Sequence, residues 1–152
     1  MHPDFTPVVQ RAISLRGRPL DESQRALLAR YVDRLVVATA VLNLTAVRDI
    51  PGVYRRHIAE SLAFLRLLEE QGVLPTGARV IDVGSGGGLP GIPFAIARPD
   101  LHVTLLESAG KKAVFLRDTV AALELPHVDV LAARAEEVGR DSAHRERYDV
   151  AV

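Results

Sequence analysis

A cluster of five glycines directly after a short apolar run limits the fold of this chain more than any other feature. Residues 80–83 read Val-Ile-Asp-Val, which is typical of a buried strand. The glycines are Gly84, Gly86, Gly87, Gly88 and Gly91. A helix is predicted to begin near Pro93, because proline suits the first turn of a helix. Glycine permits positive φ and close approach of a ligand, so this order of elements predicts a loop that offers bare backbone amides to a ligand.

The second strand of the pattern ends in an acid. Residues 102–107 form another apolar run that finishes at Glu107, about twenty residues beyond the loop. A carboxylate at this place accepts hydrogen bonds from the ribose hydroxyls of a nucleoside. We therefore expect a nucleoside-containing ligand.

Two interpretations of the glycines compete. Asp82, Gly84, Gly86 and Gly88 form Asp-x-Gly-x-Gly-x-Gly, which resembles the S-adenosylmethionine loop of Rossmann-like methyltransferases. Gly86, Gly88 and Gly91 also satisfy the dinucleotide fingerprint G-x-G-x-x-G. In that fingerprint the first glycine normally stands at the end of the strand, whereas Gly86 lies beyond it. We favour the methyltransferase interpretation.

The remaining pattern alternates strands with helices. Helices are predicted over residues 5–15, from a cap at Asp21 to residue 42, over 53–71 and over 111–123. Further strands are predicted over 128–133 and 148–152. Such alternation indicates an α/β fold with a parallel sheet. The segment 75–77 is the expected boundary between an N-terminal helical lead-in (1–75) and a Rossmann-like part (76–152).

A strand that closes the sequence leaves apolar sheet faces without covering helices. We therefore expect the sequence to be a fragment of a longer protein, or the product of a truncated gene, with C-terminal strands missing.

Composition excludes several classes of protein. The 152 residues are 48% hydrophobic and 25% charged, which is ordinary for one globular domain. Acidic and basic residues number 19 each, so the formal net charge is zero and gives no indication of a nucleic-acid partner. Cysteine is absent and the five histidines lack ligand spacing, so neither disulfides nor a metal site is expected. Without a signal peptide or membrane-spanning run, we expect a monomeric cytoplasmic protein.

Five segments in order closely resemble the bacterial glucose-inhibited division protein B family, the small-subunit ribosomal RNA guanine-N7 methyltransferases. They are NLTAVRD (43–49), RHIAES (56–61), DVGSGGGLPGIP (82–93), LESAGKKAVFL (106–116) and RAEE (134–137). The chain departs from the family at Ala38-Thr39, where Trp-Asn is common. A Ser-Arg-Ala segment, whose arginine approaches the cofactor in the family, would fall beyond Val152.

The resemblance implies a Rossmann-like fold that binds S-adenosylmethionine and methylates N7 of a guanine in 16S ribosomal RNA, alone or in the 30S particle. The implied cofactor-binding residues are Asp82, Gly84, Ser85, Gly86, Gly88, Leu89, Glu107, Ser108, Ala135 and Glu136. The candidates for contact with RNA are Arg48, Arg56, His57, Lys111 and Lys112. Arginine and histidine in the first turn of a helix oppose the helix dipole, which hints at a purpose other than stability.

Guanine N7 carries a lone pair and no proton, so no general base and no catalytic dyad are predicted. Asp82 either stabilises charge near the base or, as we favour, binds loop amides and holds the turn. Other possibilities stay open: a methyltransferase with another acceptor, a nucleotide-dependent enzyme with the same loop, or an inactive module that binds RNA or the ribosome.

Overall fold

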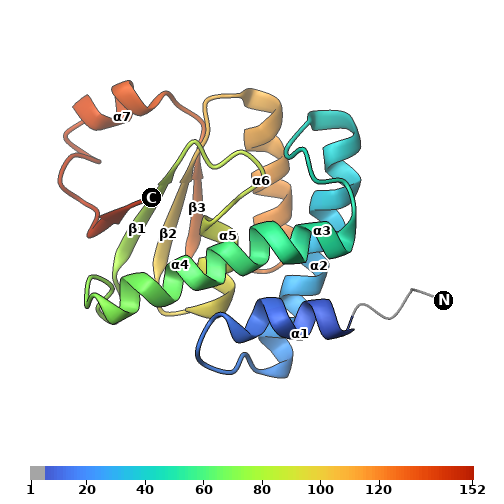
Figure 1. Ribbon diagram of the computed structural model, residues 1–152. Helices are drawn as coiled ribbons and strands as arrows, with labels where there is room; N and C mark the ends of the chain where they lie inside the picture. The colour runs from blue at the N-terminus through green and yellow to red at the C-terminus, as the bar shows by residue number, and fades with distance from the viewer. Residues whose placement is uncertain (1–5) are drawn as a thin grey trace.

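The computed structural model describes residues 6–152, which form a four-stranded parallel sheet with helices packed on it (Figure 1). The helices are α1 (Thr6–Ser14), α2 (Glu22–Leu42), α3 (Ile50–Val53), the π-helical turn η1 (Tyr54–Ile58), α4 (Ala59–Glu70), α5 (Gly91–Ala97), α6 (Gly110–Ala122) and α7 (Ala135–Arg140). The strands are β1 (Arg79–Val83), β2 (His102–Leu106), β3 (Val128–Leu131) and β4 (Val150–Ala151). The predicted α/β fold with a parallel sheet is confirmed.

The strand order is β3-β2-β1-β4, so β1 lies inside the sheet between β2 and β4. In register, Val80 faces Val103 and Val128 faces Val103 from the other side. These side chains point to one face of the sheet and belong to the main core. Ile81 and Leu106 point to the opposite face, where Val138 of α7 covers them. Alternation along each strand thus divides the apolar residues between two layers.

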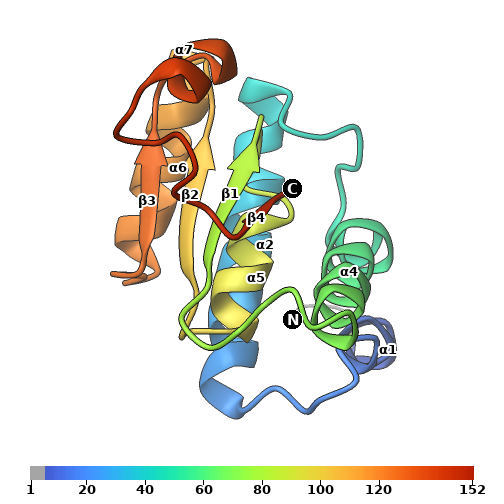
Figure 2. The same cartoon turned by 90° about the vertical axis from the view of Figure 1, so that its left-hand side faces the viewer.

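The main core joins the N-terminal helices to the sheet. Leu28 and Leu35 of α2 are buried in the same cluster as Val80 and as Phe94 of α5. Figure 2 shows α2 and α5 side by side next to β1, with α4 and α1 beyond them. The apolar residues that recur at helical spacing on α2 therefore form a packing face.

Most predicted elements are confirmed, with shifts at their ends. Asp21 caps α2 and forms a capping box with Gln24. The first helix was predicted from Phe5, which lies outside the described residues. The helix predicted from Val53 begins at Ile50, and it is interrupted by η1 before α4. This π-helical turn, a rare element in which the backbone hydrogen bonds join residues i and i+5, was not predicted from the sequence.

The later elements are slightly shorter or shifted. α5 begins at Gly91, with Pro93 inside its first turn. β3 ends at Leu131 and β4 comprises only Val150 and Ala151. Hydrogen bonds from Val83 N to Val152 O and from Val152 N to Ile81 O nevertheless hold the chain along β1 as far as Val152.

Candidate functional site

The glycine loop and Glu107 lie next to each other at the carboxyl edge of the sheet. Val83, the last residue of β1, is in register with Leu106, the last residue of β2. Residues 84–90 and Glu107 follow these two ends directly. Figure 2 shows the arrowheads of β1 and β3 pointing towards the end of the sheet at which α7 lies. Ligands of open parallel sheets bind at this edge, beside the point where the strand order reverses.

The carboxylate of Glu107 is held in place by the backbone. Its Oε2 accepts a hydrogen bond from Gly86 N at 2.8 Å, and its Oε1 accepts one from Ala109 N at 2.8 Å. The residue is 8% exposed. An ionised carboxylate offers about four lone-pair sites, so about two remain for further donors. Glu107 is thus preset to accept hydrogen bonds from a pair of hydroxyl groups.

The loop glycines fall into two kinds. Gly84 has a φ of +76° and Gly86 a φ of +56°, and a Cβ atom on Gly84 would meet no protein atom within 4 Å. A Cβ atom on Gly86 would meet only the carbonyl oxygen of Gly84, at 3.9 Å. These two positions face open space next to Glu107. They form a cradle that a ligand can fill and that a side chain would obstruct.

The other glycines face the packed interior. A Cβ atom on Gly88 would lie 2.4 Å from Ile92 Cδ1, and one on Gly91 would lie 2.4 Å from Leu105 Cδ2. Gly87 is similarly crowded by Leu35 of α2, at 2.6 Å. Gly88, predicted to bind the cofactor, therefore lacks a side chain for a packing reason.

The prediction of bare loop amides is wrong. Gly84 N and Ser85 N donate to the carbonyl oxygen of Leu106, at 2.8 and 3.0 Å. Gly86 N donates to Glu107, and Gly88 N to Ser85 O at 2.7 Å. The acceptors of Gly84 N, Ser85 N and Gly86 N belong to residues 106–107, about twenty residues away, so the loop pattern alone could not reveal these hydrogen bonds.

Asp82 holds the loop against α5. It is 2% exposed, and its Oδ2 accepts a hydrogen bond from Gly91 N at 3.0 Å. Desolvation by burial raises the pKa of Asp82 to about 7. The favoured role of Asp82, binding loop amides to fix the turn, matches this contact. A dinucleotide needs the N-terminus of this helix for its pyrophosphate, and here a carboxyl group occupies that place.

Tyr31 of α2 is a residue of the loop's surroundings that the sequence analysis did not single out. Its side chain is fully buried, and its hydroxyl donates a hydrogen bond to Gly87 O at 2.9 Å. Burial raises the pKa of Tyr31 well above its ordinary value. A tyrosine within a stripe of leucine and valine was the available signal, because a buried hydroxyl needs a partner.

The other predicted cofactor residues are spread around the same edge. Ser85 is buried and donates from Oγ to Asp82 O at 2.8 Å, while Leu89 is half-buried. Ser108 is exposed directly after Glu107. Ala135 and Glu136 are exposed in the first turn of α7, which follows β3. The first turns of α6 and α7 lie at the same end of the sheet (Figure 1).

The predicted RNA contacts differ in their surroundings. Arg56 and Lys111 are exposed, and Lys112 is half-buried at the start of α6. Arg48 donates from Nη2 to Asn43 Oδ1 at 3.2 Å, close to the end of α2. His57 lies in η1, and its Nε2 is hydrogen-bonded to Thr45 Oγ1. Burial lowers the pKa of His57 from its ordinary value.

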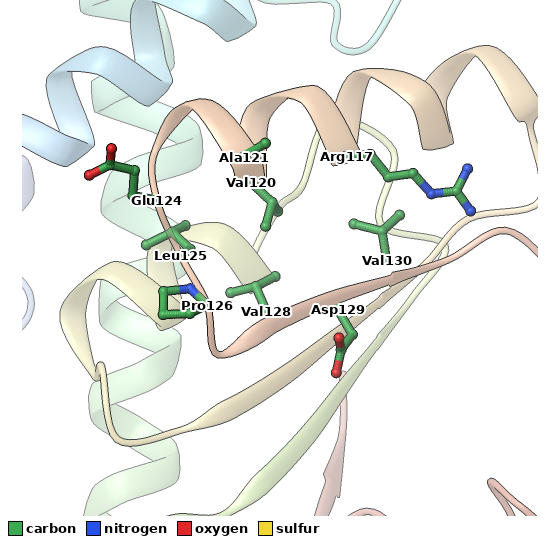
Figure 3. Close-up of a pocket in the computed structure, with 9 residues that line it drawn as sticks. All are labelled: Arg117, Val120, Ala121, Glu124, Leu125, Pro126, Val128, Asp129 and Val130. Carbon is green, nitrogen blue, oxygen red and sulfur yellow. The ribbon is translucent and has the colours of Figure 1, made fainter.

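Of two cavities in the described part of the chain, one adjoins the glycine loop and the other lies away from the predicted cofactor residues. One of about 310 Å³ adjoins the glycine loop and is lined by Leu89 and Pro90, by Val152, and by one side of the helix that runs from η1 into α4. A larger groove of about 520 Å³ lies between α6 and β3 (Figure 3). None of the predicted cofactor residues lines that groove, so its size does not make it the site.

Within residues 6–152, no group of three or more histidine, aspartate or glutamate residues is arranged to hold a metal ion. In the same part of the chain, no helix is sufficiently long and apolar to span a membrane.

Comparison with known proteins places the chain near one family. A family model described as rRNA small subunit methyltransferase G matches residues 24–152. Proteins named ribosomal RNA small subunit methyltransferase G from Roseiflexus sp. (strain RS-1) and Sorangium cellulosum are 48% identical over 134 residues and 49% identical over 124 residues. These alignments cover 88% and 82% of this chain, but 55% and 51% of the two relatives. The chain thus spans about half the length of the curated relatives it matches.

A solved structure supports the fold. A protein-L-isoaspartate O-methyltransferase structure from Plasmodium falciparum, in complex with S-adenosyl-L-homocysteine, aligns with a TM-score of 0.58. The alignment covers 99% of this chain and 72% of that one, at 17% sequence identity. The likeness supports a Rossmann-like methyltransferase fold and nothing finer.

Proposed function

Because the chain belongs to the rRNA small subunit methyltransferase G family, we propose that the protein transfers a methyl group from S-adenosylmethionine to N7 of a guanine in small-subunit (16S) ribosomal RNA. The observation that carries the proposal is the open cradle at Gly84 and Gly86 beside the preset carboxylate of Glu107. An adenosyl group presents two adjacent ribose hydroxyls, which suit the remaining lone pairs of Glu107.

The residues around the cradle fit S-adenosylmethionine better than a dinucleotide. The cofactor carries a positive charge at sulfur and no phosphate, so it does not need free amides at the start of α5. Glu107 and the loop carbonyls supply acceptors, and Asp82 occupies the helix terminus that a pyrophosphate would require. Ser85, Gly88, Leu89 and Ser108 would complete the cradle, with adenine received at Ala135 and Glu136.

The chain's part in the reaction is to position the two partners. When bound, S-adenosylmethionine supplies a methyl group that the sulfonium charge already activates. Guanine N7 has an exposed lone pair and no proton, so no side chain has to remove one. Rate enhancement then comes mainly from holding N7 in line with the methyl carbon and from excluding water.

Recognition of RNA would rest on a local group of cations, because the overall formal charge is zero. Arg48, Arg56, Lys111 and Lys112 are the proposed cationic contacts, and His57, whose pKa is lowered by burial, is proposed to contact RNA as a neutral hydrogen-bonding group. Phosphate contacts of this kind weaken as salt concentration rises. The expected substrate is structured rRNA or the 30S particle, met in the cytoplasm by a monomeric protein. Efficient methylation of a short naked oligonucleotide would contradict this.

Calorimetric titration of the full-length gene product tests the cofactor site. S-adenosylmethionine should bind, NAD should not, and Glu107→Gln should weaken binding by roughly 1–3 kcal/mol. Gly84→Ala should also weaken binding, because its methyl group enters the cradle and because the φ of +76° strains a residue that carries a side chain.

Methyl transfer tests the acceptor. Incubation with unmethylated 30S particles and labelled cofactor should produce 7-methylguanosine, which borohydride and aniline cleavage detects. Cofactor binding without such a product would favour another acceptor. A folded protein that binds no cofactor but holds rRNA would instead indicate a binding module.

A further inference from the structure

The cavity beside the glycine loop has the volume and the lining residues of a site for a single base. Its volume of about 310 Å³ lies at the lower end of the ~300–1,000 Å³ found for small-molecule pockets. Leu89 and Pro90 form the wall next to the cradle, and Val152 lies beside β1. Since β1 separates β2 from β4, Glu107 and this cavity flank the loop on opposite sides.

The opposite wall is a stripe of three polar residues and one aromatic residue on the helix that runs from η1 into α4. His57, Glu60, Ser61 and Phe64 recur at positions i, i+3, i+4 and i+7, so they share one helical face that lines the cavity. Ile58, Leu62 and Leu65 of the same helix are fully buried in the core instead. The stripe is thus separate from the packing face.

Ser61 offers the cavity a hydroxyl group. The residue is 5% exposed and borders the cavity, and its hydroxyl makes no hydrogen bond with any other part of residues 6–152. In the same part of the chain the buried side-chain atoms without a partner are Arg16 Nε and Thr39 Oγ1, so Ser61 Oγ is accessible from the cavity. A bound group can therefore donate to Ser61 Oγ.

The other side chains of the stripe suit a purine. Glu60 is exposed and, within residues 6–152, forms no hydrogen bond or ion pair, although its charge acts on the neighbouring His57. Its carboxylate is an acceptor for the donors that guanine presents at N1 and N2. Phe64 is 38% exposed and borders the cavity, while its ring also lies in tilted contact with that of Phe94, at 5.8 Å between centroids. Bases removed from a stack are read in this way, by hydrogen bonds to the Watson–Crick edge and by aromatic contact.

We propose that this cavity receives the guanine to be methylated, with Glu60 and Ser61 accepting from its Watson–Crick edge, Phe64 stacked on it, and N7 directed at the cradle. This inference rests on the proposed function and names its acceptor site. In guanine, N7 lies on the opposite side of the ring system from N1 and N2. When the N1–N2 edge binds the helix, N7 is therefore turned towards Leu89. The stripe therefore selects guanine and orients it.

The test uses guanosine and inosine 5′-monophosphate as competitors of methyl transfer by the full-length gene product. Inosine monophosphate lacks only the N2 amine. Guanosine monophosphate should inhibit the wild-type protein roughly tenfold more strongly, because the amine donates to a charged acceptor. Glu60→Gln should abolish this preference and lower kcat/KM for rRNA about tenfold. Its Kd for S-adenosylmethionine should change less than about twofold.

Glu70→Gln is the matched control, because it makes the same change at an exposed position of α4 outside the cavity. It should keep both the preference and the activity. Ser61→Ala provides a second variant, which should weaken inhibition by both nucleotides equally while cofactor binding persists.

The failures are distinguishable. Equal inhibition of the wild type by the two nucleotides, or inhibition by neither, would overturn the base site. So would a Glu60→Gln variant that keeps its preference, or one that loses cofactor binding as strongly as methyl transfer. No transfer by the wild type would overturn the proposed function, and the base site with it.

Discussion

At the scale of single residues, two buried acids organise the glycine loop from opposite sides. Glu107 accepts from Gly86 N, and Asp82 accepts from Gly91 N. Their environments differ, because Glu107 adjoins the open cradle whereas Asp82 lies 2% exposed beneath the loop. The carboxylate of Glu107 can therefore accept hydrogen bonds from a ligand, whereas that of Asp82 holds the loop in place.

Asp82 should make stability depend on pH. Its pKa is about 7 in the folded protein and near 3.8 when unfolded, because burial penalises the charged form. Below pH 3.8 the carboxyl is protonated in both states and carries no penalty. Between about pH 4 and 7 the folded state binds the proton of Asp82 more tightly than the unfolded state does. The free energy of unfolding therefore falls as pH rises through this range, by on the order of 4 kcal/mol at most.

Urea denaturation between pH 4 and 8 measures this effect. Asp82→Asn should flatten the pH dependence, since the amide oxygen can still accept from Gly91 N but no longer ionises. Asp129→Asn, at an exposed position of β3, is the control and should keep the wild-type slope. If the free energy of unfolding varied with pH equally in Asp82→Asn and in the wild type, the pH dependence could not be assigned to Asp82.

At the scale of elements, a buried ion network joins the segment after α1 to α4 and α5. Arg16 is 3% exposed and forms a bidentate pair with Glu69, whose Oε1 also accepts from Arg98 Nη1 at 2.7 Å. Arg98 in turn binds Asp100, which holds the pKa of that carboxyl at about 2. The network fixes the ends of these elements relative to one another.

Glu69→Gln should destabilise the protein by about 3–5 kcal/mol, because it leaves the buried Arg16 guanidinium without a counter-charge. Glu70→Gln removes only an exposed pair with Arg66 and should change stability by less than ~1 kcal/mol. Chemical denaturation of the two neighbouring variants compares them directly. Similar losses would mean that burial does not decide the strength of these pairs.

At the scale of the whole molecule, the N-terminal helices support the sheet part rather than merely precede it. Tyr31 donates to Gly87 O, and Gln24 Nε2 donates to Ile96 O at 3.0 Å near the end of α5. Arg30 donates from Nη2 to Ala122 O at the end of α6. One helix therefore satisfies carbonyl groups of the loop and of two helix ends.

Residues 76–152 alone should consequently fail to form a stable fold. Without residues 1–75, the apolar faces that meet Leu28 and Leu35 would be exposed to water, and the carbonyl of Gly87 would lose its partner. Circular dichroism and amide chemical-shift dispersion check this. A cooperative unfolding transition in the 76–152 fragment would show that the lead-in is dispensable for folding.

The sequence by itself determined most of the helices and strands, with η1 and α7 as exceptions, together with the parallel α/β class, the cap at Asp21 and the family. These depend on periodicity, on turn residues and on motifs, all of which are local in the chain. The pairing of Glu107 with the glycine loop was also within reach, because successive parallel strands end at the same edge of a sheet.

Only the tertiary structure decided how each loop glycine is used, because a Cβ atom at Gly84 meets open space and one at Gly88 meets Ile92. The same holds for the hydrogen bond of Tyr31 and for the unpaired hydroxyl of Ser61 beside a cavity. Each of these depends on which atoms approach from segments tens of residues away. Propensity and spacing describe a residue's own segment, whereas burial and hydrogen bonding depend on the neighbours that folding brings to it.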